Sequence, residues 1–110
     1  MRTILRSSEF DAFYTSLPER VREKVKYALN IMTEIAVVNT KLVKRLIGTD
    51  FYELRISMEN EWRVIMYTLD SESFIECRTV LMLNGFMKKS TKDYRKEIDR
   101  AQKILGGFQI

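Results

Sequence analysis

The sequence predicts an α+β domain in which an N-terminal αα-hairpin packs on a small antiparallel sheet and a C-terminal helix follows the sheet. Apolar residues recur at helical spacing before residue 40 and again after residue 90. Between them, residues 51–83 contain three runs that are typical of strands. Because 110 residues is the size of one domain, we expect a single domain over residues 1–110.

The N-terminal third is expected to form a short strand and then two helices. Residues 2–6 alternate weakly, which favours a strand that could join the sheet. A serine at position 7 or 8 can cap a short first helix, and Pro18 suits the first turn of a longer second helix that ends near residues 38–39. The apolar stripe of the second helix comprises Val21, Val25, Ala28, Leu29, Met32, Ile35 and Ala36.

The remaining elements are expected to be a meander and a last helix. Residues 40–48 are predicted to be a connector that can include a helical turn and that closes at Gly48 with a positive φ. Strands are expected over residues 51–58, 62–69 and 74–83, joined by polar loops. Asn84-Gly85 would end the third strand, and Phe86 would anchor the next turn. Ser90 or Thr91 would cap the last helix, which Gly106-Gly107 would stop.

The first hairpin can adopt two registers, which place its arginines differently. A two-residue loop at Glu59 and Asn60 would put Arg63 among the core residues, whereas an odd loop over residues 58–60, with Asn60 left-handed, would put Arg55 opposite Arg63. We predict the odd loop, because burying an unpaired arginine costs several kcal/mol. That register leaves one face of the hairpin open, with Glu53, Arg55, Arg63, Ile65 and Tyr67 on it.

The face toward the αα-hairpin would then be apolar. It would carry Leu54, Ile56, Trp62, Val64 and Met66 from the first two strands and Ile75, Cys77, Leu81 and Leu83 from the third. On the open face the third strand would present Glu76, Arg78, Val80 and Met82, so that Arg78 extends the positive strip. An anion could sit between Arg55 and Arg63; alternatively, Glu53 neutralises the pair in a surface ion cluster.

Positive charge is concentrated near the C-terminus. Residues 86–103 hold seven bases and three acids, which accounts for the formal net charge of +4 of the whole chain. Such a segment suits a phosphate backbone or an acidic protein, or it is simply a solvated helix face. The bases are Lys88, Lys89, Lys92, Arg95, Lys96, Arg100 and Lys103, and the acids are Asp93, Glu97 and Asp99.

Several classes of chemistry are excluded by composition. The chain has no histidine, no paired-cysteine metal motif, no glycine-rich phosphate loop and no nucleophile elbow, so we expect neither a metal nor a cofactor. The single Cys77 is expected to be a small buried hydrophobe in a strand. Without a signal region or a run of about 18 uncharged apolar residues, we expect a cytoplasmic protein that does not contact a membrane.

Arginine, lysine, glutamate and tyrosine suit the cleavage of RNA by its own 2′-hydroxyl. The substrate carries the nucleophile, and guanidinium groups can hold the phosphate and stabilise the extra negative charge of the transition state. The missing part is a base, since lysine is a poor base at neutral pH unless its pKa is depressed. Crowding among Arg55, Arg63, Lys88 and Lys89 could depress it.

Four stretches of the sequence resemble the RelE/ParE superfamily of toxins, and more narrowly its HigB-like, phage-related branch. They are the runs VKRLIGT from Val43, YELRI from Tyr52, WRVI from Trp62 and NGFMKKS from Asn84. The resemblance covers essentially the whole chain and implies a RelE-like fold. The sequence departs from the family pattern at Asn84, where many relatives have histidine, and at Tyr94, where a proline often opens the last helix.

The resemblance implies the toxin of a type II toxin-antitoxin module, an endoribonuclease that cleaves mRNA, usually on the ribosome. Its partner would be a helix-turn-helix antitoxin (HigA-like). The toxin would be brought to operator DNA only by this antitoxin. Carried over to this sequence, Arg55 and Arg63 would contact the phosphate, and Lys88 and Lys89 would act as base or as further contacts. Glu53 and Tyr67 are further catalytic candidates, and the predicted RNA-binding residues are Lys44, Arg45, Arg78, Lys92 and Arg95.

Two other functions fit the same fold. ParE-type relatives poison DNA gyrase by binding and need no catalytic group. A basic binding module without activity, whose open face serves only an antitoxin, is the third reading.

Overall fold

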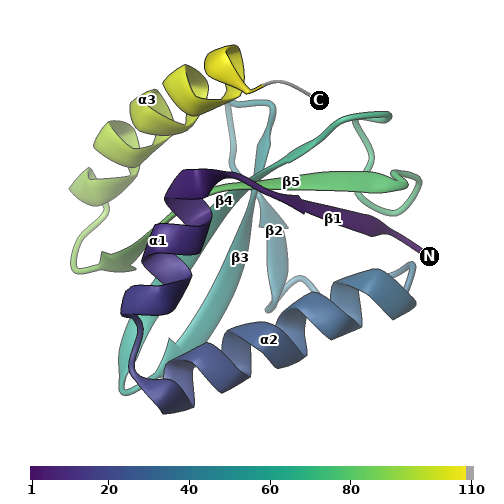
Figure 1. Ribbon diagram of the computed structural model, residues 1–110. Coiled ribbons are helices and arrows are strands. Elements are labelled where there is room, and N and C mark those ends of the chain that lie inside the picture. Colours follow the sequence, from purple (N-terminus) through teal and green to yellow (C-terminus); the bar gives the residue numbers. More distant parts are fainter. Residues whose placement is uncertain (109–110) are drawn as a thin grey trace.

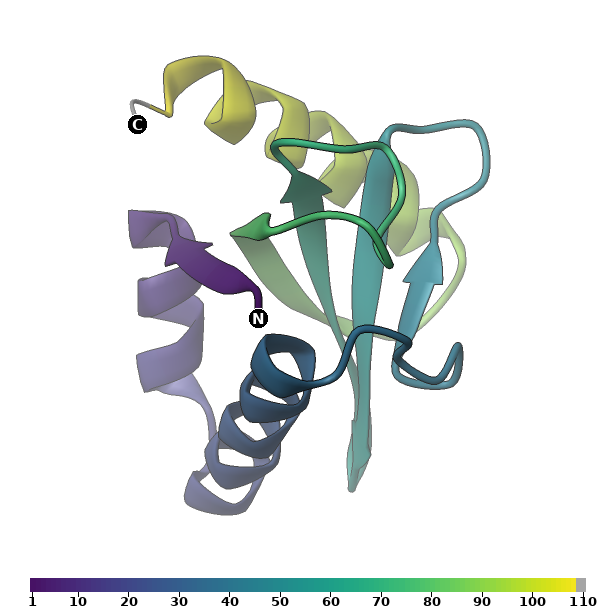
Figure 2. The same cartoon turned by 90° about the vertical axis from the view of Figure 1, so that its right-hand side faces the viewer.

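The computed structural model describes residues 1–108 and shows a five-stranded sheet between two helical layers (Figures 1 and 2). The strand order is β1-β5-β4-β3-β2, with β1 parallel to β5 and the other neighbours antiparallel. The predicted α+β class is therefore confirmed. The elements are β1 Thr3–Arg6, α1 Ser8–Ser16, α2 Glu19–Glu34, β2 Val43–Arg45, β3 Phe51–Met58, β4 Asn60–Thr68, β5 Thr79–Lys88 and α3 Lys92–Gly107.

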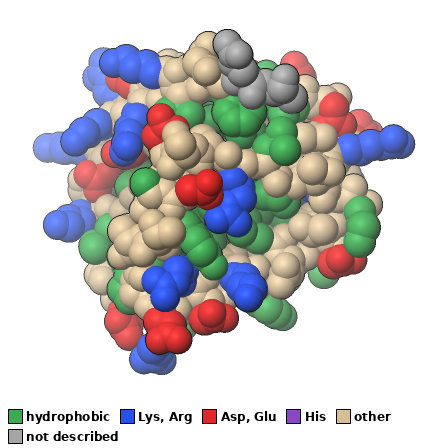
Figure 3. Space-filling view, viewed as in Figure 1, with side chains coloured by type: hydrophobic (Ala, Val, Ile, Leu, Met, Phe, Trp, Pro, Cys, Tyr) green, Lys and Arg blue, Asp and Glu red, His purple; other side chains and the backbone are tan. Residues whose placement is uncertain are grey.

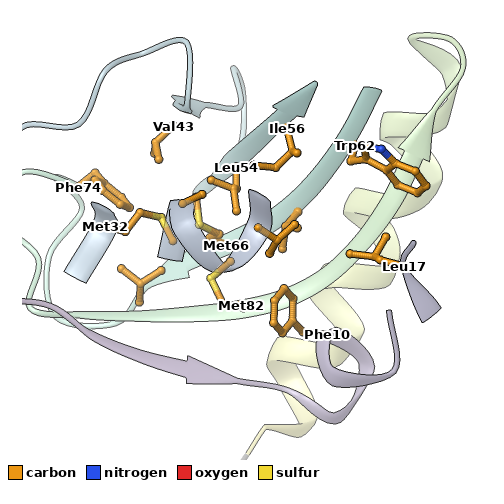
Figure 4. Packing of buried hydrophobic residues seen from close by; sticks show 14 of the residues in the cluster. Phe10, Leu17, Met32, Val43, Leu54, Ile56, Trp62, Met66, Phe74 and Met82 are labelled. Carbon is orange, nitrogen blue, oxygen red and sulfur yellow. The ribbon is translucent and has the colours of Figure 1, made fainter. Parts of the chain in front are cut away.

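The larger core lies between α1, α2 and one face of the sheet (Figure 4). Phe10 and Met32 from the helices meet Leu54, Val64 and Met82 from the strands, and all five are fully buried. Burying side chains of this size stabilises the fold by about 1.5–3 kcal/mol each. The αα-hairpin formed by α1 and α2 packs on the sheet as predicted. Its apolar residues recur at helical spacing and face alternate residues of the strands.

Helix α2 ends at Glu34, four to five residues earlier than predicted. Ile35 is already extended, and the β-branched residues that follow it disfavour helix. Arg2 also closes the helix: Nη1 donates to the carbonyls of Met32 and Ile35 at 2.8 and 2.6 Å, and Nη2 donates to Ala36. A cation at the helix C-terminus satisfies carbonyls that have no partner within the helix.

The predicted connector contains a strand as well as the predicted turn, which the N–H groups of Leu42 and Val43 close by donating to the Asn39 carbonyl. Strand β2 pairs with β3 at the edge of the sheet, with Lys44 opposite Glu53 and Arg45 opposite Tyr52. Gly48 closes the segment with φ +77°, as predicted. This strand was not predicted, because three residues carry too little alternation to be recognised and pairing with β3 decides their conformation.

The register of the first hairpin is confirmed, since Arg55 lies opposite Arg63. The left-handed residue of the turn is Glu59, with φ +63°, and not Asn60, which already pairs with Met58 in the ladder. The loop is therefore odd, as predicted, but shorter than the predicted three residues.

The third predicted strand was placed too early. β5 begins at Thr79, because the Asp70 carboxylate accepts hydrogen bonds from the backbone N–H groups of Arg78 and Thr79 and holds residues 70–78 as a loop. Cys77 lies in a turn of this loop, where it is buried as expected and where burial raises the pKa of its thiol. Ile75, predicted to be core, is exposed. At its other end the strand continues through Asn84-Gly85 and Phe86 to Lys88.

The faces of β5 are the reverse of the prediction and change at a bulge. Val80 and Met82 face α1 and α2, whereas Leu81 and Leu83 face α3. The register shifts between Ile65 and Met66, so that Met66 lies opposite Met82 but Ile65 lies opposite Asn84. One extra residue in β5 turns every later side chain over. Asn84, Phe86 and Lys88 therefore face α3.

The face expected to be open is covered by α3. A second core there joins Ile65, Leu81, Leu83 and Ala101, all fully buried. The apolar stripe of α3 was recognised in the sequence, but its partner surface was not. In the part of the chain that the structure describes, no helix is long and apolar enough to cross a membrane.

Candidate active site

A pocket of about 320 Å³ opens between α3, β2 and the ends of β3 and β5. It gathers three cationic side chains around one carboxylate and one phenol, and Arg45 borders it with its guanidinium directed to Tyr52 and the Thr49 carbonyl. Larger pockets occur elsewhere on the molecule. Such a concentration of positive charge in a concavity favours an anionic ligand. The lining residues are Lys44, Arg45, Leu46, Ile47, Glu53, Arg55, Lys88, Tyr94 and Ile98.

Glu53 is the centre of the polar network beside this pocket. Its Oε1 accepts a 2.7 Å hydrogen bond from the hydroxyl of Tyr94 and lies 3.1 Å from Nε of Arg63. Nε of Arg55 lies farther away, at 3.8 Å. Only 6% of Glu53 is exposed, so these cationic and hydroxyl partners offset the cost of burying its charge.

Arg63 lies opposite Arg55 as predicted, but it is buried beneath α3 instead of facing solvent. Only 2% of it is exposed, and its guanidinium donates to Tyr94 Oη at 3.0 Å, to the Trp62 carbonyl at 2.9 Å and to Glu61 Oε1 at 3.2 Å. Burial opposes the charge, but the hydrogen bond to Tyr94 and the nearby carboxylates raise the pKa of Arg63 above its ordinary value. Arg63 does not line the pocket, and its N–H groups are already engaged by protein atoms. Its role is therefore to hold Glu53 and Tyr94 in position.

Tyr94 joins the two halves of the site, and the sequence prediction missed it. The sequence comparison with the family pattern had noted it only as a departure at the start of the last helix. Its ring lies under the Lys88 ammonium, with Nζ 5.5 Å from the ring centroid, and packs edge-on against Phe86. Burial, reinforced by the hydrogen bond to Glu53, raises the pKa of Tyr94, so its hydroxyl remains a donor at neutral pH. A tyrosine just after the Lys88-Lys89 turn was the available signal.

Arg55 and Lys88 are the cations of the pocket that are best placed for a ligand. The Arg55 side chain is 34% exposed, and its contact to Glu53 is long. Lys88 is partly buried, and no ion pair engages it among residues 1–108. Cations held in place before a ligand arrives stabilise negative charge without further reorganisation.

The comparisons with known proteins agree with this geometry. The family model described as "Phage derived protein Gp49-like" matches residues 12–105. The chain belongs to this family. A comparison with curated proteins found no match for this Gp49-like chain.

Solved structures with a similar fold include three of E. coli RelE. A chain of the intact E. coli RelBE toxin-antitoxin complex has a TM-score of 0.62 at 16% identity and covers 82% of this chain and 100% of its own length. A mutant of E. coli RelE in the free state has a TM-score of 0.64 at 17% identity and covers 90% of this chain and 96% of its own length. Isolated E. coli RelE has a TM-score of 0.63 at 17% identity and covers 91% of this chain and 98% of its own length. The Gp49-like chain therefore has a RelE-like fold, as the resemblance in sequence implied.

The remaining predicted site residues are dispersed. Lys44 and Arg45 line the pocket, but Lys89 is exposed beyond it and Tyr67 lies in the neighbouring pocket. Arg78 precedes β5 at the opposite end from Lys88, about 30 Å away along the strand. Lys92 and Arg95 lie on the outer face of α3, where Lys and Arg side chains project at the upper left of Figure 3.

Asn84, where the sequence was expected to depart from the family pattern, supports α3 instead of the pocket. It is fully enclosed and donates to the backbone carbonyl and to Oε1 of Glu97 at 3.1 and 3.0 Å. The carboxylate of Glu97 also lies 3.9 Å from Arg100. This Gp49-like protein therefore uses the position to attach α3 to the sheet through a buried amide and carboxylate.

Proposed function

We propose that this Gp49-like protein is the toxin of a toxin-antitoxin pair and that it cleaves mRNA by 2′-hydroxyl attack, without a metal or cofactor. The observation that carries the proposal is the pocket in which Arg55, Lys88 and Lys44 surround Glu53 and Tyr94. A phosphodiester with its own 2′-hydroxyl needs charge stabilisation and proton transfer, and these residues supply both.

In the proposed reaction the RNA supplies the nucleophile. The guanidinium of Arg55 and the ammonium of Lys88 hold the non-bridging oxygens of the phosphate, and Glu53 accepts the proton of the 2′-hydroxyl. The 2′-oxygen bonds to phosphorus as the bond from phosphorus to O5′ breaks. The departing O5′ takes a proton from Lys88. The products are a 2′,3′-cyclic phosphate and a 5′-hydroxyl.

Glu53 is assigned as the base because it is the carboxylate that lines the pocket. Its Oε1 is occupied by Tyr94 and Arg63, so Oε2 is the atom that would take the proton. In this scheme Lys88 contacts the phosphate and gives its proton to O5′, and Glu53 keeps the proton taken from the 2′-hydroxyl until product release. The earlier candidates Lys89 and Tyr67 have no part in it, and Arg63 acts by holding Glu53 in place.

The partners proposed for the protein are an antitoxin, mRNA and the ribosome. The RelE-like fold supports the antitoxin, because one similar structure is a RelBE toxin-antitoxin complex. We propose an antitoxin of the helix-turn-helix, HigA-like type, and a cytoplasmic site of action. Cleavage on the ribosome is tested by comparing programmed ribosomes with the same mRNA alone.

A brief pulse of expression in a bacterium, followed by mapping of transcript ends, tests the proposal. Wild-type protein should stop growth and produce new 5′ ends, and Arg55→Ala and Lys88→Met should each reduce cleavage by about 100-fold or more. Arg20→Ala is the matched control, because Arg20 is exposed on α2 on the opposite side of the sheet.

Two outcomes would contradict the proposal. If Arg55→Ala and Lys88→Met are as toxic as the wild type, the pocket is not the active site. If transcripts stay intact while a DNA-damage response appears, the protein acts as a gyrase-poisoning toxin.

A further inference from the structure

A second pocket, of about 560 Å³, adjoins the candidate active site on the same side of the sheet. Arg45 lines both pockets and stands between them. The two pockets follow one another along α3: Tyr94 and Ile98 border the first, and Gln102 and Leu105 border the second. Eight residues of helix separate Tyr94 from Gln102, a distance of about 12 Å.

The two pockets also follow one another along β3, at a similar distance. Arg55, Glu53 and Phe51 follow each other on the face of β3 that α3 covers, and Tyr67 lies opposite Phe51 in β4. Four residues of strand place Phe51 about 13 Å from Arg55. A single RNA strand whose phosphate is held at Arg55 would therefore continue past Arg45 to the second pocket.

The second pocket has a different chemical character from the first. Its charged residues, Arg45 and Asp50, balance each other, whereas the active-site pocket gathers three cations around one carboxylate. The rings of Phe51 and Tyr67 pack edge to face with centroids 6.1 Å apart, and Leu105 adds apolar surface. A balanced, partly aromatic pocket suits an uncharged ring better than it suits a phosphate.

Gln102 provides the polar group that such a pocket needs for recognition. It is exposed on α3 and lines the pocket, and its amide offers both a donor and an acceptor. Unstacked RNA bases are recognised by stacking on aromatic side chains and by hydrogen bonds to their edges. In this pocket Tyr67 offers an aromatic ring for stacking, and Gln102 offers an amide for hydrogen bonds to the base edge.

We propose that the second pocket binds the base of a nucleotide next to the scissile phosphate, with Tyr67 as the stacking surface and Gln102 as the reader of the base edge. The inference rests on the proposed function of the adjoining site. It assigns to Tyr67 a role in base binding in place of catalysis, and it makes Gln102 the residue that sets the sequence preference of cleavage.

The first experiment compares cleavage sites. An RNA pool with randomised sequence is cleaved by wild-type protein and by Gln102→Ala, under the condition in which the wild type is active, and the new 5′ ends are sequenced. The base preference at one position beside the cut should fall by roughly threefold to tenfold in Gln102→Ala, as expected for one lost hydrogen bond. Asp99→Ala is the control on the same helix, because Asp99 lies on its outer face.

The second experiment measures binding and does not depend on cleavage. Trinucleotides with a 2′-deoxy sugar at the scissile position are titrated into the protein, and the side-chain amide of Gln102 and the backbone amide of Gly48 are followed by NMR. Both signals should shift for the preferred base, and Tyr67→Leu should weaken binding about tenfold, as the loss of one base stack predicts.

The outcomes separate this inference from the proposed function. If the wild type cleaves but the base preference of Gln102→Ala is unchanged, the second pocket is not a base site and the proposed function stands. If the trinucleotides shift signals only around Arg55 and Lys88, the inference is also wrong. If the wild type cleaves no RNA but Gln102 and Gly48 respond to one base, the base site stands and the proposed reaction fails.

Discussion

The hydroxyl of Tyr94 donates a 2.7 Å hydrogen bond to Oε1 of Glu53, and this bond connects α3 to the middle of β3. The same hydroxyl accepts a hydrogen bond from Nε of Arg63 at 3.0 Å. Tyr94→Phe should therefore lower the free energy of unfolding by about 1–2 kcal/mol, because a buried carboxylate and a buried guanidinium each lose a partner. Urea denaturation measures this, and Tyr27→Phe is the control because Tyr27 is 67% exposed.

Alkaline pH should weaken the same connection. Burial raises the pKa of Tyr94, so its hydroxyl keeps its proton in the folded protein at a pH where the unfolded chain has lost it. The folded state then binds more protons, and stability falls as the pH rises above about 10. Thermal unfolding between pH 8 and pH 11 should show this fall in the wild type and a smaller one in Tyr94→Phe. An equal fall in both proteins would show that Tyr94 is not responsible.

Removal of Arg63 should be costly because it leaves Glu53 buried without its closest cation. Arg63→Met should reduce stability by about 3–5 kcal/mol, and Glu53→Gln in the same background should restore part of it, since the uncompensated charge is then gone. A double-mutant cycle by urea denaturation measures the coupling. Arg20→Ala removes an exposed ion pair to Glu59 and should cost less than about 1 kcal/mol. Additive effects at Arg63 and Glu53 would contradict the network.

Gly85 has no room for a side chain. A Cβ there would lie 2.3 Å from the ring of Phe13, so Gly85→Ala should cost about 1–3 kcal/mol through overpacking, and Phe13→Leu should relieve part of that cost. Gly106→Ala is the matched control: it meets nothing within 4 Å and lies in α3, where alanine should stabilise by about 0.5–1 kcal/mol. Equal melting temperatures for the two variants would contradict this packing.

Arg2 should matter for stability although it is the second residue of the chain. Its guanidinium donates to carbonyls at the end of α2 and to the carbonyl of Phe74, and it lies 4.1 Å from the Phe74 ring centroid. Arg2→Met should cost about 1.5–3 kcal/mol, because buried carbonyls lose a charged donor. Arg6→Met, which removes an exposed ion pair to Asp11, is the control and should cost less than about 1 kcal/mol. Hydrogen exchange should accelerate at the last turn of α2 in Arg2→Met alone.

Some of the candidate site could be predicted from the sequence, and the rest could not, for identifiable reasons. Alternation and the cost of burying an unpaired arginine were enough to place Arg55 opposite Arg63. They were not enough to show that Arg63 is buried, because its compensating partners come from α3 and from Glu53. Lys88 reaches the pocket because the bulge opposite Ile65 and Met66 reverses the faces of β5. A bulge leaves no periodicity in the sequence from which it could be inferred.

The sequence by itself determined the class of fold, the helical hairpin, the hairpin register and the absence of histidine chemistry, since each depends on local periodicity or on composition. Only the tertiary structure decided which face α3 covers, where α2 ends and which cations share a pocket. These depend on contacts between residues far apart in the chain, such as Tyr94 with Glu53 and Arg2 with Ala36. Such contacts form because each buried polar group needs a hydrogen-bond partner, and the local sequence does not say which distant residue will supply that partner.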